Sequence, residues 1–375
     1  MLSEITIDAN ALRRNYRFFE SRVGRERLAV VLKSNAYGHG LKQVYEVLAQ
    51  LNPAWICVNY LDEARRLRGF GYQGRLLVCG PFMPDQVQAA ADAAADVFVG
   101  THEALAAVLA STSPVRIHLE FDTGMSRQGF APSEASTLAG QLATHVANRP
   151  ELLSGVCTHF ANVEDVLEHE YADKQLAHFA DVRAAFVARG MKPLFHAASS
   201  ASTLILPDSI MDLHRVGISL YGQWPSQATR LSFLSTSGDV DGLQPVLSWG
   251  ARLTSVIDIG PGQYVGYGCT FRATRKMRIG VVPVGYYEGF PRSVSGSQAY
   301  VLVEGARCSV VGRVCMNMTM VDVTEVAGAK VGMPAILIGR QGGESIHASE
   351  LAAWGDTIHY EILTRLNPEI PRRIV

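Results

Sequence analysis

The sequence predicts an α/β fold: a (β/α)8 barrel of the TIM type over residues 1–230, followed by a mostly antiparallel β domain over residues 231–375. Eight short apolar segments alternate with segments of helical periodicity in the first part, which is the count for such a barrel. Near residue 225 this alternation stops, and short strand candidates separated by Gly and Pro follow. Polar side chains cluster just after several of the first eight segments, where a barrel places its functional groups.

The barrel strands are predicted from short runs of aliphatic and β-branched residues, because a parallel strand is covered on both faces. They are Leu28–Leu32, Ala54–Val58, Arg75–Cys79, Asp96–Val99, Val115–Phe121, Leu152–Thr158, Pro193–Ala197 and Met211–Val216. The helical patterns between them include Leu41–Leu51, Leu61–Phe70, Asp85–Ala95, Thr101–Leu109, Glu134–Ala147 and Tyr171–Arg189. A doubly wound open sheet is the alternative. The lack of G-x-G-x-x-G after the first strand disfavours a dinucleotide-binding version of it.

The second part begins after Gln223–Asp241, a segment rich in Ser, Gly, Pro and Gln that we interpret as a linker. The strand candidates beyond it are Ser248–Ile257, Tyr264–Phe271, Met277–Val284, Ala299–Val303, Cys308–Val314, Met318–Val323 and Ala335–Ile338. One helix, His347–Trp354, is predicted near the end.

Composition excludes several classes of function. Apolar residues make up 48% of the chain, enough for a large core, and the formal net charge is −1. No basic stripe is present, which disfavours a nucleic-acid or membrane-surface role. Met1–Asp8 lacks the charged and apolar regions of a secretory signal. The six cysteines are scattered without C-x-x-C spacing. We therefore expect reduced thiols in a cytoplasmic protein.

The carboxyl ends of the predicted barrel strands carry the residues with the most chemistry. Lys33 and Tyr37 follow the first strand, and a lysine in a site with little water can attack a carbonyl to form a Schiff base. The candidate site residues after strands five to eight are Asp122, Arg127, His159, Ser199, Ser200, Arg215, Gly217, Ile218 and Tyr221. An amine, a histidine, two arginines and a phosphate-type loop suit an anionic cofactor that bears an aldehyde. Pyridoxal 5'-phosphate (PLP) fits that description.

Each of these residues also has a simpler interpretation. His159 could be a core histidine, Arg127 and Arg215 surface ion-pair partners, and Gly217 a turn glycine. Ser199 and Ser200 could cap the following helix. Taken singly, the simpler interpretation is favoured for His159 and the serines. Their joint position at strand ends favours a site.

Several ordered motifs resemble those of the bacterial alanine racemases, and the resemblance runs from Ile5-Thr6-Ile7-Asp8 to Pro371-Arg372. The first motif, Leu32-Lys33-Ser34-Asn35-Ala36-Tyr37-Gly38-His39-Gly40, is similar to the PLP-attachment signature of that family. The others are Asp122–Arg127, Thr158–Ala161, Arg215–Gly222, Val265–Gly268, Val284–Tyr286, Val311–Met316 and His359–Glu361.

The resemblance implies a site shared between the subunits of a homodimer. Lys33 would carry PLP and act as one catalytic base, and Tyr267 of the other subunit would be the opposite base. Arg215 would contact the pyridine nitrogen, and His159 would support the ring. The implied phosphate ligands are Tyr37, Ser200, Gly217, Ile218 and Tyr360. The implied carboxylate ligands of the substrate are Arg127 and the Met316 backbone, and the entrance would be lined by Tyr286, Arg292 and Arg313.

The chain departs from the family pattern at three positions. Glu120 stands where the family usually has a lysine, commonly carbamylated, that positions the arginine matching Arg127. We expect Glu120, ionised at pH 7, to bond Arg127 directly or through a water. Ser199 replaces a usual asparagine. Asn317 replaces a usual aspartate, which removes a charge near the entrance.

These features predict a PLP-dependent amino-acid racemase that interconverts L- and D-alanine by a two-base mechanism and supplies D-alanine for peptidoglycan. A serine or broad-specificity racemase on the same scaffold is the first alternative, and a PLP-dependent decarboxylase, disfavoured by Tyr267, is the second. A non-catalytic PLP carrier would lack the β domain. A metal-dependent barrel hydrolase would need clustered His and carboxylate ligands at strand ends, and the sequence offers no such set, so no metal is expected.

Overall fold

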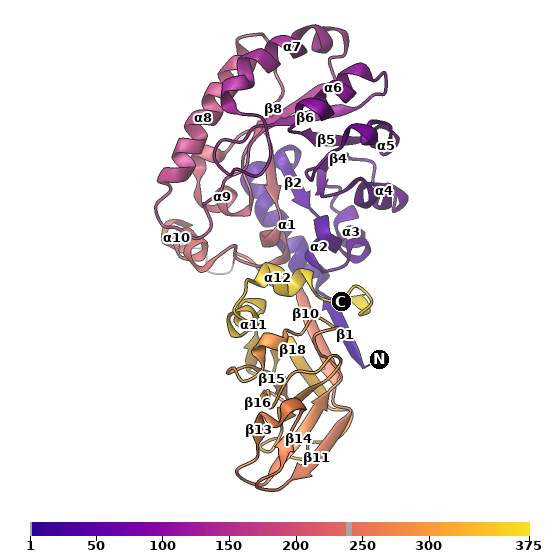
Figure 1. The fold of residues 1–375 in the computed structure, drawn as a ribbon, viewed down its shortest axis with the longest axis vertical. Coiled ribbons are helices and arrows are strands. Elements are labelled where there is room, and N and C mark those ends of the chain that lie inside the picture. Colours follow the sequence, from indigo (N-terminus) through magenta and orange to yellow (C-terminus); the bar gives the residue numbers. More distant parts are fainter. Residues whose placement is uncertain (1, 238–241) are drawn as a thin grey trace. The chain divides into compact units, whose positions relative to one another are not determined.

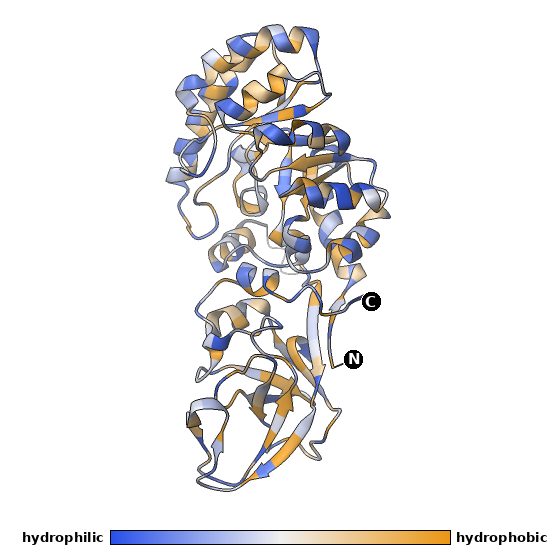
Figure 2. Cartoon of the chain, turned by 45° about the vertical axis from the view of Figure 1, so that its right-hand side comes forward, coloured by the Kyte–Doolittle hydropathy of each residue, from blue (hydrophilic) through white to orange (hydrophobic). Residues whose placement is uncertain are grey.

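The computed structural model describes residues 2–237 and 242–375, and these form two compact units. The barrel unit comprises residues 10–34 and 45–244, and the sheet unit comprises residues 1–9, 35–44 and 245–375. Figure 1 labels many of the elements of both units, and in Figure 2 many of their strands carry the colour of hydrophobic residues. The predicted division at residue 230 stays a prediction, because a compact unit need not be a separately folding domain. No helix in the described ranges is both long and apolar enough to cross a membrane.

The barrel unit is built on eight strands that pair in parallel in the order β8-β7-β6-β5-β4-β3-β2-β9. They are β2 (Leu28–Val31), β3 (Trp55–Val58), β4 (Arg75–Val78), β5 (Ala95–Val99), β6 (Arg116–Glu120), β7 (Leu153–Cys157), β8 (Leu194–His196) and β9 (His214–Val216). The backbone N–H of Arg215 donates to the carbonyl of Ala198 at 3.0 Å, which links β9 to the end of β8. All eight predicted strands overlap observed ones, so the predicted barrel fold is confirmed.

Helices alternate with these strands, and those that begin at residues 41, 61, 87, 102, 135 and 170 match predicted segments. They are α1 (Ala9–Val23), α3 (Leu41–Ala49), α4 (Leu61–Gly69), α5 (Val87–Asp92), α6 (His102–Ala110), α7 (Ala135–Asn148), α8 (Glu170–Val187), α9 (Ser200–Ile205) and α10 (Gln227–Ser237). The strands between them are almost entirely buried, as for Leu28–Val31 and Trp55–Val58. Burial on both faces explains why their sequences are continuous apolar runs.

The sheet unit is mostly antiparallel, as predicted. Its largest sheet has the order β16-β15-β18-β10-β1-β20 with β19 paired to β18, and smaller sheets join β11-β14-β17 and β12-β13. The strands are β1 (Ser3–Ile7), β10 (Leu247–Arg252), β11 (Ser255–Ile259), β12 (Tyr264–Val265), β13 (Phe271–Arg272), β14 (Met277–Val282), β15 (Tyr300–Val303), β16 (Ala306–Ser309), β17 (Thr319–Asp322), β18 (Pro334–Gln341), β19 (Glu344–Ile346) and β20 (Arg372–Ile374). Two helices, α11 (Ala348–Trp354) and α12 (His359–Thr364), complete the unit.

The linker interpretation of Gln223–Asp241 is wrong for most of its length, because residues 227–237 form α10. The remaining residues 238–241 lie outside the described part of the chain. Phe233 explains the helix: it is fully buried and packs 5.9 Å from the ring of Phe18 and 5.3 Å from that of Trp224. Packing of one aromatic residue thus overrides a polar, turn-like composition.

Candidate active site

Lys33 lies directly after β2, where the chain makes a left-handed turn, α2 (Lys33–Tyr37). The φ angles of residues Ser34 to Tyr37 lie between 51° and 56°. Each such residue costs about 1–2 kcal/mol in an L-peptide, so contacts must hold the turn. Glu63 supplies one of them: its Oε1 accepts from the N–H of Ser34 at 2.7 Å, and its Oε2 accepts from the N–H of Asn59 at 2.8 Å. One carboxylate therefore ties the lysine turn to the end of β3.

Arg215, on β9, is held from two sides. Its NH2 group donates to the carbonyls of Thr158 at 2.8 Å and Ala197 at 3.1 Å and lies 3.2 Å from Nδ1 of His159. Its NH1 group donates to Nδ1 of His196. Its Nε makes no hydrogen bond within the described ranges, so one fixed donor is left for a further group.

His159, which follows β7, lies among the cationic groups. Burial, and then the positive charges of Arg215, Arg127 and Lys33, hold the pKa of His159 well below its usual range. The imidazole is therefore neutral. Of these three cationic groups, Arg215 contacts the ring directly, at 3.2 Å from Nδ1.

Ser200 begins α9, and its Oγ accepts from the backbone N–H of Gly217 at 2.9 Å and of Ser219 at 3.5 Å. Ser199 is the N-cap residue of that helix, and its N–H donates to Oγ of Ser202 at 2.7 Å. The capping alternative therefore holds for Ser199. Ser200 instead joins the loop that contains Gly217 and Ile218.

Arg127 ends a loop organised by Asp122. Oδ1 of Asp122 accepts from the backbone N–H groups of Gly124, Met125 and Ser126 at 2.9, 2.8 and 3.0 Å. Burial would raise the pKa of Asp122, but these bonds outweigh it and lower the pKa. The carboxylate thus stays charged and fixes the path of the chain into Arg127.

Glu120 is 3% exposed, and its carboxylate accepts a hydrogen bond from Nε2 of Gln128. Among the described residues, Arg127 makes no hydrogen bond to it, so the expected direct contact is not formed. Burial raises the pKa of Glu120 to about 7, although Gln128 and the charges of Arg215 and Arg127 lower it. The expectation of a fully ionised Glu120 at pH 7 is therefore wrong: burial makes the group titrate near neutrality.

We expect the KM for L-alanine to fall as the pH rises through about 7, because ionised Glu120 holds the positive Arg127 by charge. Glu120→Gln should remove this pH dependence and raise KM about fivefold at pH 8, with a smaller change in kcat. Activity should not need bicarbonate. Steady-state kinetics from pH 6 to 9 check this, with the exposed Glu151→Gln as the matched control. An unchanged KM in Glu120→Gln, or loss of wild-type activity when CO2 is stripped, would show that Glu120 does not replace the modified lysine.

In the sheet unit, Tyr267 occupies an exposed turn between β12 and β13 and is 72% exposed. Gly268 follows with φ of 73°, and a Cβ there would lie 2.8 Å from NH1 of Arg313. Glycine thus lets the Arg313 side chain lie against the Tyr267 turn. The neighbouring loops are joined by backbone bonds, from Tyr286 to Cys315 at 3.1 Å and from Tyr287 to Met316 at 2.9 Å.

Asn317 has a specific structural role. Its Nδ2 donates to Oε1 of Glu288 at 2.7 Å, and Oε2 of Glu288 accepts from the N–H of Gly285 at 2.8 Å. An aspartate at position 317 would place two like charges together. The asparagine thus matches Glu288, and the pair braces the loops that carry Tyr286 and Met316.

Tyr37 and Tyr360, two of the predicted phosphate ligands, lie together in the sheet unit with ring centroids 6.4 Å apart. The approach depends on Gly38, because a Cβ there would come within 1.8 Å of the carbonyl of Leu363. Ser200, Gly217 and Ile218, the other three predicted ligands, belong to the barrel unit.

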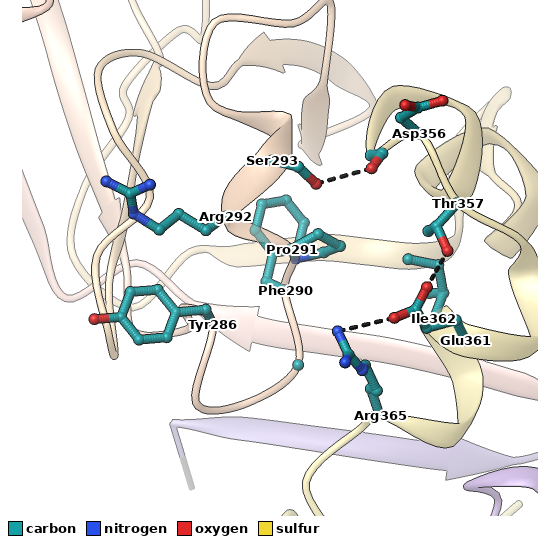
Figure 3. Close-up of a pocket in the computed structure, with 12 residues that line it drawn as sticks. Tyr286, Phe290, Pro291, Arg292, Ser293, Asp356, Thr357, Glu361, Ile362 and Arg365 are labelled. Atoms are coloured by element: carbon teal, nitrogen blue, oxygen red, sulfur yellow. Dashed lines mark hydrogen bonds and ion pairs between the residues drawn. The ribbon is translucent and has the colours of Figure 1, made fainter.

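Tyr286 and Arg292 line a cavity of about 590 Å³ in the sheet unit. Figure 3 places these two side chains on one side and the ion pair of Glu361 with Arg365, at 2.9 Å, on another. The cavity therefore carries two of the three predicted entrance residues, and the third, Arg313, is not among the residues that line it.

The predicted site lacks Glu63, Gln128 and a buried histidine pair, His118 and His196. The pair was detectable in part: His118 and Glu120 share one face of β6, and polar residues at alternate positions of a barrel strand indicate an interior polar cluster. The pairing of His118 with His196, 2.8 Å apart across separate strands, could not be read from local pattern.

Comparisons with known proteins agree with these observations. Two family models match: "Alanine racemase, N-terminal domain" over residues 7–225 and "Alanine racemase, C-terminal domain" over residues 246–374. A curated alanine racemase from Leptospira interrogans is 40% identical over 353 residues, covering 93% of this chain and 89% of the relative. One from Symbiobacterium thermophilum is 35% identical over 373 residues, with 98% and 95% covered. The crystal structure of alanine racemase from Streptomyces lavendulae has a TM-score of 0.91 at 32% identity, covering 100% of this chain and 97% of that one. The Bacillus anthracis enzyme, described with bound L-Ala-P, has a TM-score of 0.89 at 31% identity, with 100% and 95% covered.

Proposed function

The chain belongs to the alanine racemase family, and from this we propose that it interconverts L-alanine and D-alanine with PLP bound at Lys33. The observation that carries the proposal is that Lys33, Arg127, His159 and Arg215 lie at or just after the carboxyl ends of barrel strands, with Arg215 3.2 Å from the neutral ring of His159. That combination of an amine, fixed donors and a neutral ring suits an anionic aldehyde cofactor.

The residues present fit PLP. Lys33 supplies the amine, and Nε of Arg215 is a donor left over for the ring nitrogen. Ser200, Gly217, Ile218, Tyr37 and Tyr360 would hold the phosphate. When bound, PLP withdraws electrons from the substrate and so makes its Cα–H acidic.

Racemisation requires that a proton leave one face of Cα and that another arrive on the opposite face. We assign these transfers to the amine of Lys33 and the phenol oxygen of Tyr267, which avoids rotating the substrate. Arg127 and the backbone of Met316 would hold the carboxylate and keep Cα between the two bases.

Arg215 is charged and donates only. Against the ring nitrogen of bound PLP, Arg215 would therefore supply a hydrogen bond and no acidic proton, and it would so restrain transamination.

We infer a homodimer in which Tyr267 acts in the partner's site. Large apolar side chains on the Tyr267 turn and on the Arg313 loop that contacts it are exposed in the single chain, with Tyr264 54%, Met316 55% and Met318 53% exposed. Exposed apolar side chains of this kind mark protein interfaces. The reaction would supply D-alanine for peptidoglycan in the cytoplasm.

A racemisation assay tests the proposal. Purified protein with added PLP should convert L-alanine to equal amounts of both enantiomers, measured by chiral chromatography, and L-serine more slowly or not at all. Equal rates with several L-amino acids would favour the broad-specificity alternative. Release of CO2 with formation of an amine would overturn racemisation in favour of decarboxylation.

A further inference from the structure

A chain of hydrogen bonds runs through the barrel interior from Asp96 to Arg215. Oδ2 of Asp96 lies 3.2 Å from Nε2 of His118, and Nδ1 of His118 lies 2.8 Å from Nε2 of His196. Nδ1 of His196 then contacts NH1 of Arg215. Asp96, His118 and His196 are 0% exposed, and Arg215 is 7% exposed. The chain crosses four strands, β5, β6, β8 and β9, and ends at the group assigned to the ring nitrogen.

The Asp96 end can only accept hydrogen bonds. Arg116 Nε donates to Oδ1 of Asp96 at 2.7 Å, and Arg75 also binds the carboxylate. Burial alone would raise the pKa of Asp96, but the His118 bond and the charges of Arg75 and Arg116 lower the pKa to about 2. The carboxylate is therefore an anion throughout the working pH range.

The Arg215 end can only donate, because a guanidinium has no acceptor. Burial holds the pKa of His196 well below its usual range and lowers that of His118, so both rings are neutral. A neutral imidazole has one donor and one acceptor. With an acceptor at one end and a donor at the other, only one arrangement satisfies every bond: both histidines carry the proton on Nε2.

We propose that Asp96, His118 and His196 are positioning residues that hold Arg215 through this fixed tautomer chain and direct its Nε at the cofactor ring. The inference rests on the proposed function for the role of Arg215, but the tautomers follow from the protein alone. NH1 is bound to His196, and NH2 is bound to Thr158 and Ala197, so the guanidinium cannot rotate. Misplacement of a catalytic contact by about 1 Å can cost about 100-fold in rate.

The competing interpretation is a core ion pair of Asp96 with Arg75 and Arg116 that merely stabilises the barrel. His118→Phe separates the two. The substitution breaks the chain of hydrogen bonds but leaves the ion pairs of Arg75 and Arg116 with Asp96 in place. The new ring would lie among aromatic neighbours, since the His118 ring is 5.8 Å from that of Trp55 and 6.2 Å from that of Phe98.

Nitrogen-15 NMR of histidine-labelled protein tests the tautomers without any activity measurement. His118 and His196, assigned by their variants, should each show a protonated Nε2 and an unprotonated Nδ1 from pH 7 to 9. A doubly protonated ring, or a protonated Nδ1 at either histidine, would overturn the chain. The outcome of this NMR measurement does not depend on whether the protein racemises alanine.

Kinetics test the positioning. His118→Phe should lower kcat about 10- to 100-fold with KM changed less than about threefold, and should shift the absorbance band of the bound cofactor. His118→Gln, whose amide can donate to Asp96 and accept from His196, should recover most of the rate. Arg75→Gln, which touches Asp96 from outside the chain, should lower thermal stability but leave kcat within about twofold. Equal kcat losses in His118→Phe and Arg75→Gln, or no recovery in a folded His118→Gln, would assign a structural role only. If wild-type protein neither binds PLP nor racemises alanine, the proposed function fails, and the NMR result still decides the chain.

Discussion

Lys33→Ala is expected to lower kcat for alanine racemisation at least about 10³-fold in both directions, because one residue supplies both the cofactor attachment and one of the two bases. The left-handed turn that follows Lys33, which Glu63 holds by a hydrogen bond, fixes the backbone at this point. Initial rates from each enantiomer measure the effect. The absorbance band of the lysine-bound cofactor should be lost as well.

The control is Lys192→Ala, an exposed lysine that should leave the rate within about twofold. Methylamine at high concentration should partly restore Lys33→Ala, since it provides a small amine that can enter the vacated space. Retention of more than about one tenth of the wild-type rate in Lys33→Ala would remove this lysine from the mechanism.

Tyr267→Phe should lower racemisation about 10²- to 10⁴-fold, because each direction needs a proton transfer on both faces of Cα. Lys33 would still act on its own face. Exchange of the Cα hydrogen with deuterium from the solvent should therefore persist for one enantiomer and be lost for the other. Mass spectrometry of alanine recovered from reactions in D2O measures the deuterium incorporated into each enantiomer. Tyr264→Phe, an exposed tyrosine three residues earlier, is the matched control.

Mixed dimers extend this prediction to the shared site. Lys33→Ala and Tyr267→Phe subunits, each inactive, should form heterodimers with one intact site of two. With equal mixing, half of the dimers are heterodimers, so activity should return to about one quarter of the wild-type value. No recovery after subunit exchange is demonstrated would place Tyr267 and Lys33 of the same subunit together.

The barrel could be predicted because its signal is local. Each strand is a short apolar run and each helix a periodic one, and the barrel rule then places Lys33, His159 and Arg215 at one rim. Segments whose structure depends on distant partners could not be predicted. Strand β1 pairs with β10 and β20, which both lie far from it in the sequence. Helix α10 depends on the burial of Phe233.

The electrostatic details of the site also lay beyond the sequence. Glu120 was identified as a departure from the family, but its pKa near 7 and its bond to Gln128 follow from burial and loop geometry. The Asp96–His118–His196 chain joins residues up to 100 positions apart, and its direction is set by the two ends together. Such networks depend on strand register, which periodicity alone does not fix.

Borohydride reduction followed by peptide mass analysis tests the central claim most directly. The reagent fixes PLP covalently to whichever lysine holds it. The account predicts a single pyridoxyl adduct, on the peptide that contains Lys33. An adduct on any other lysine, or none in protein that racemises alanine, would contradict it.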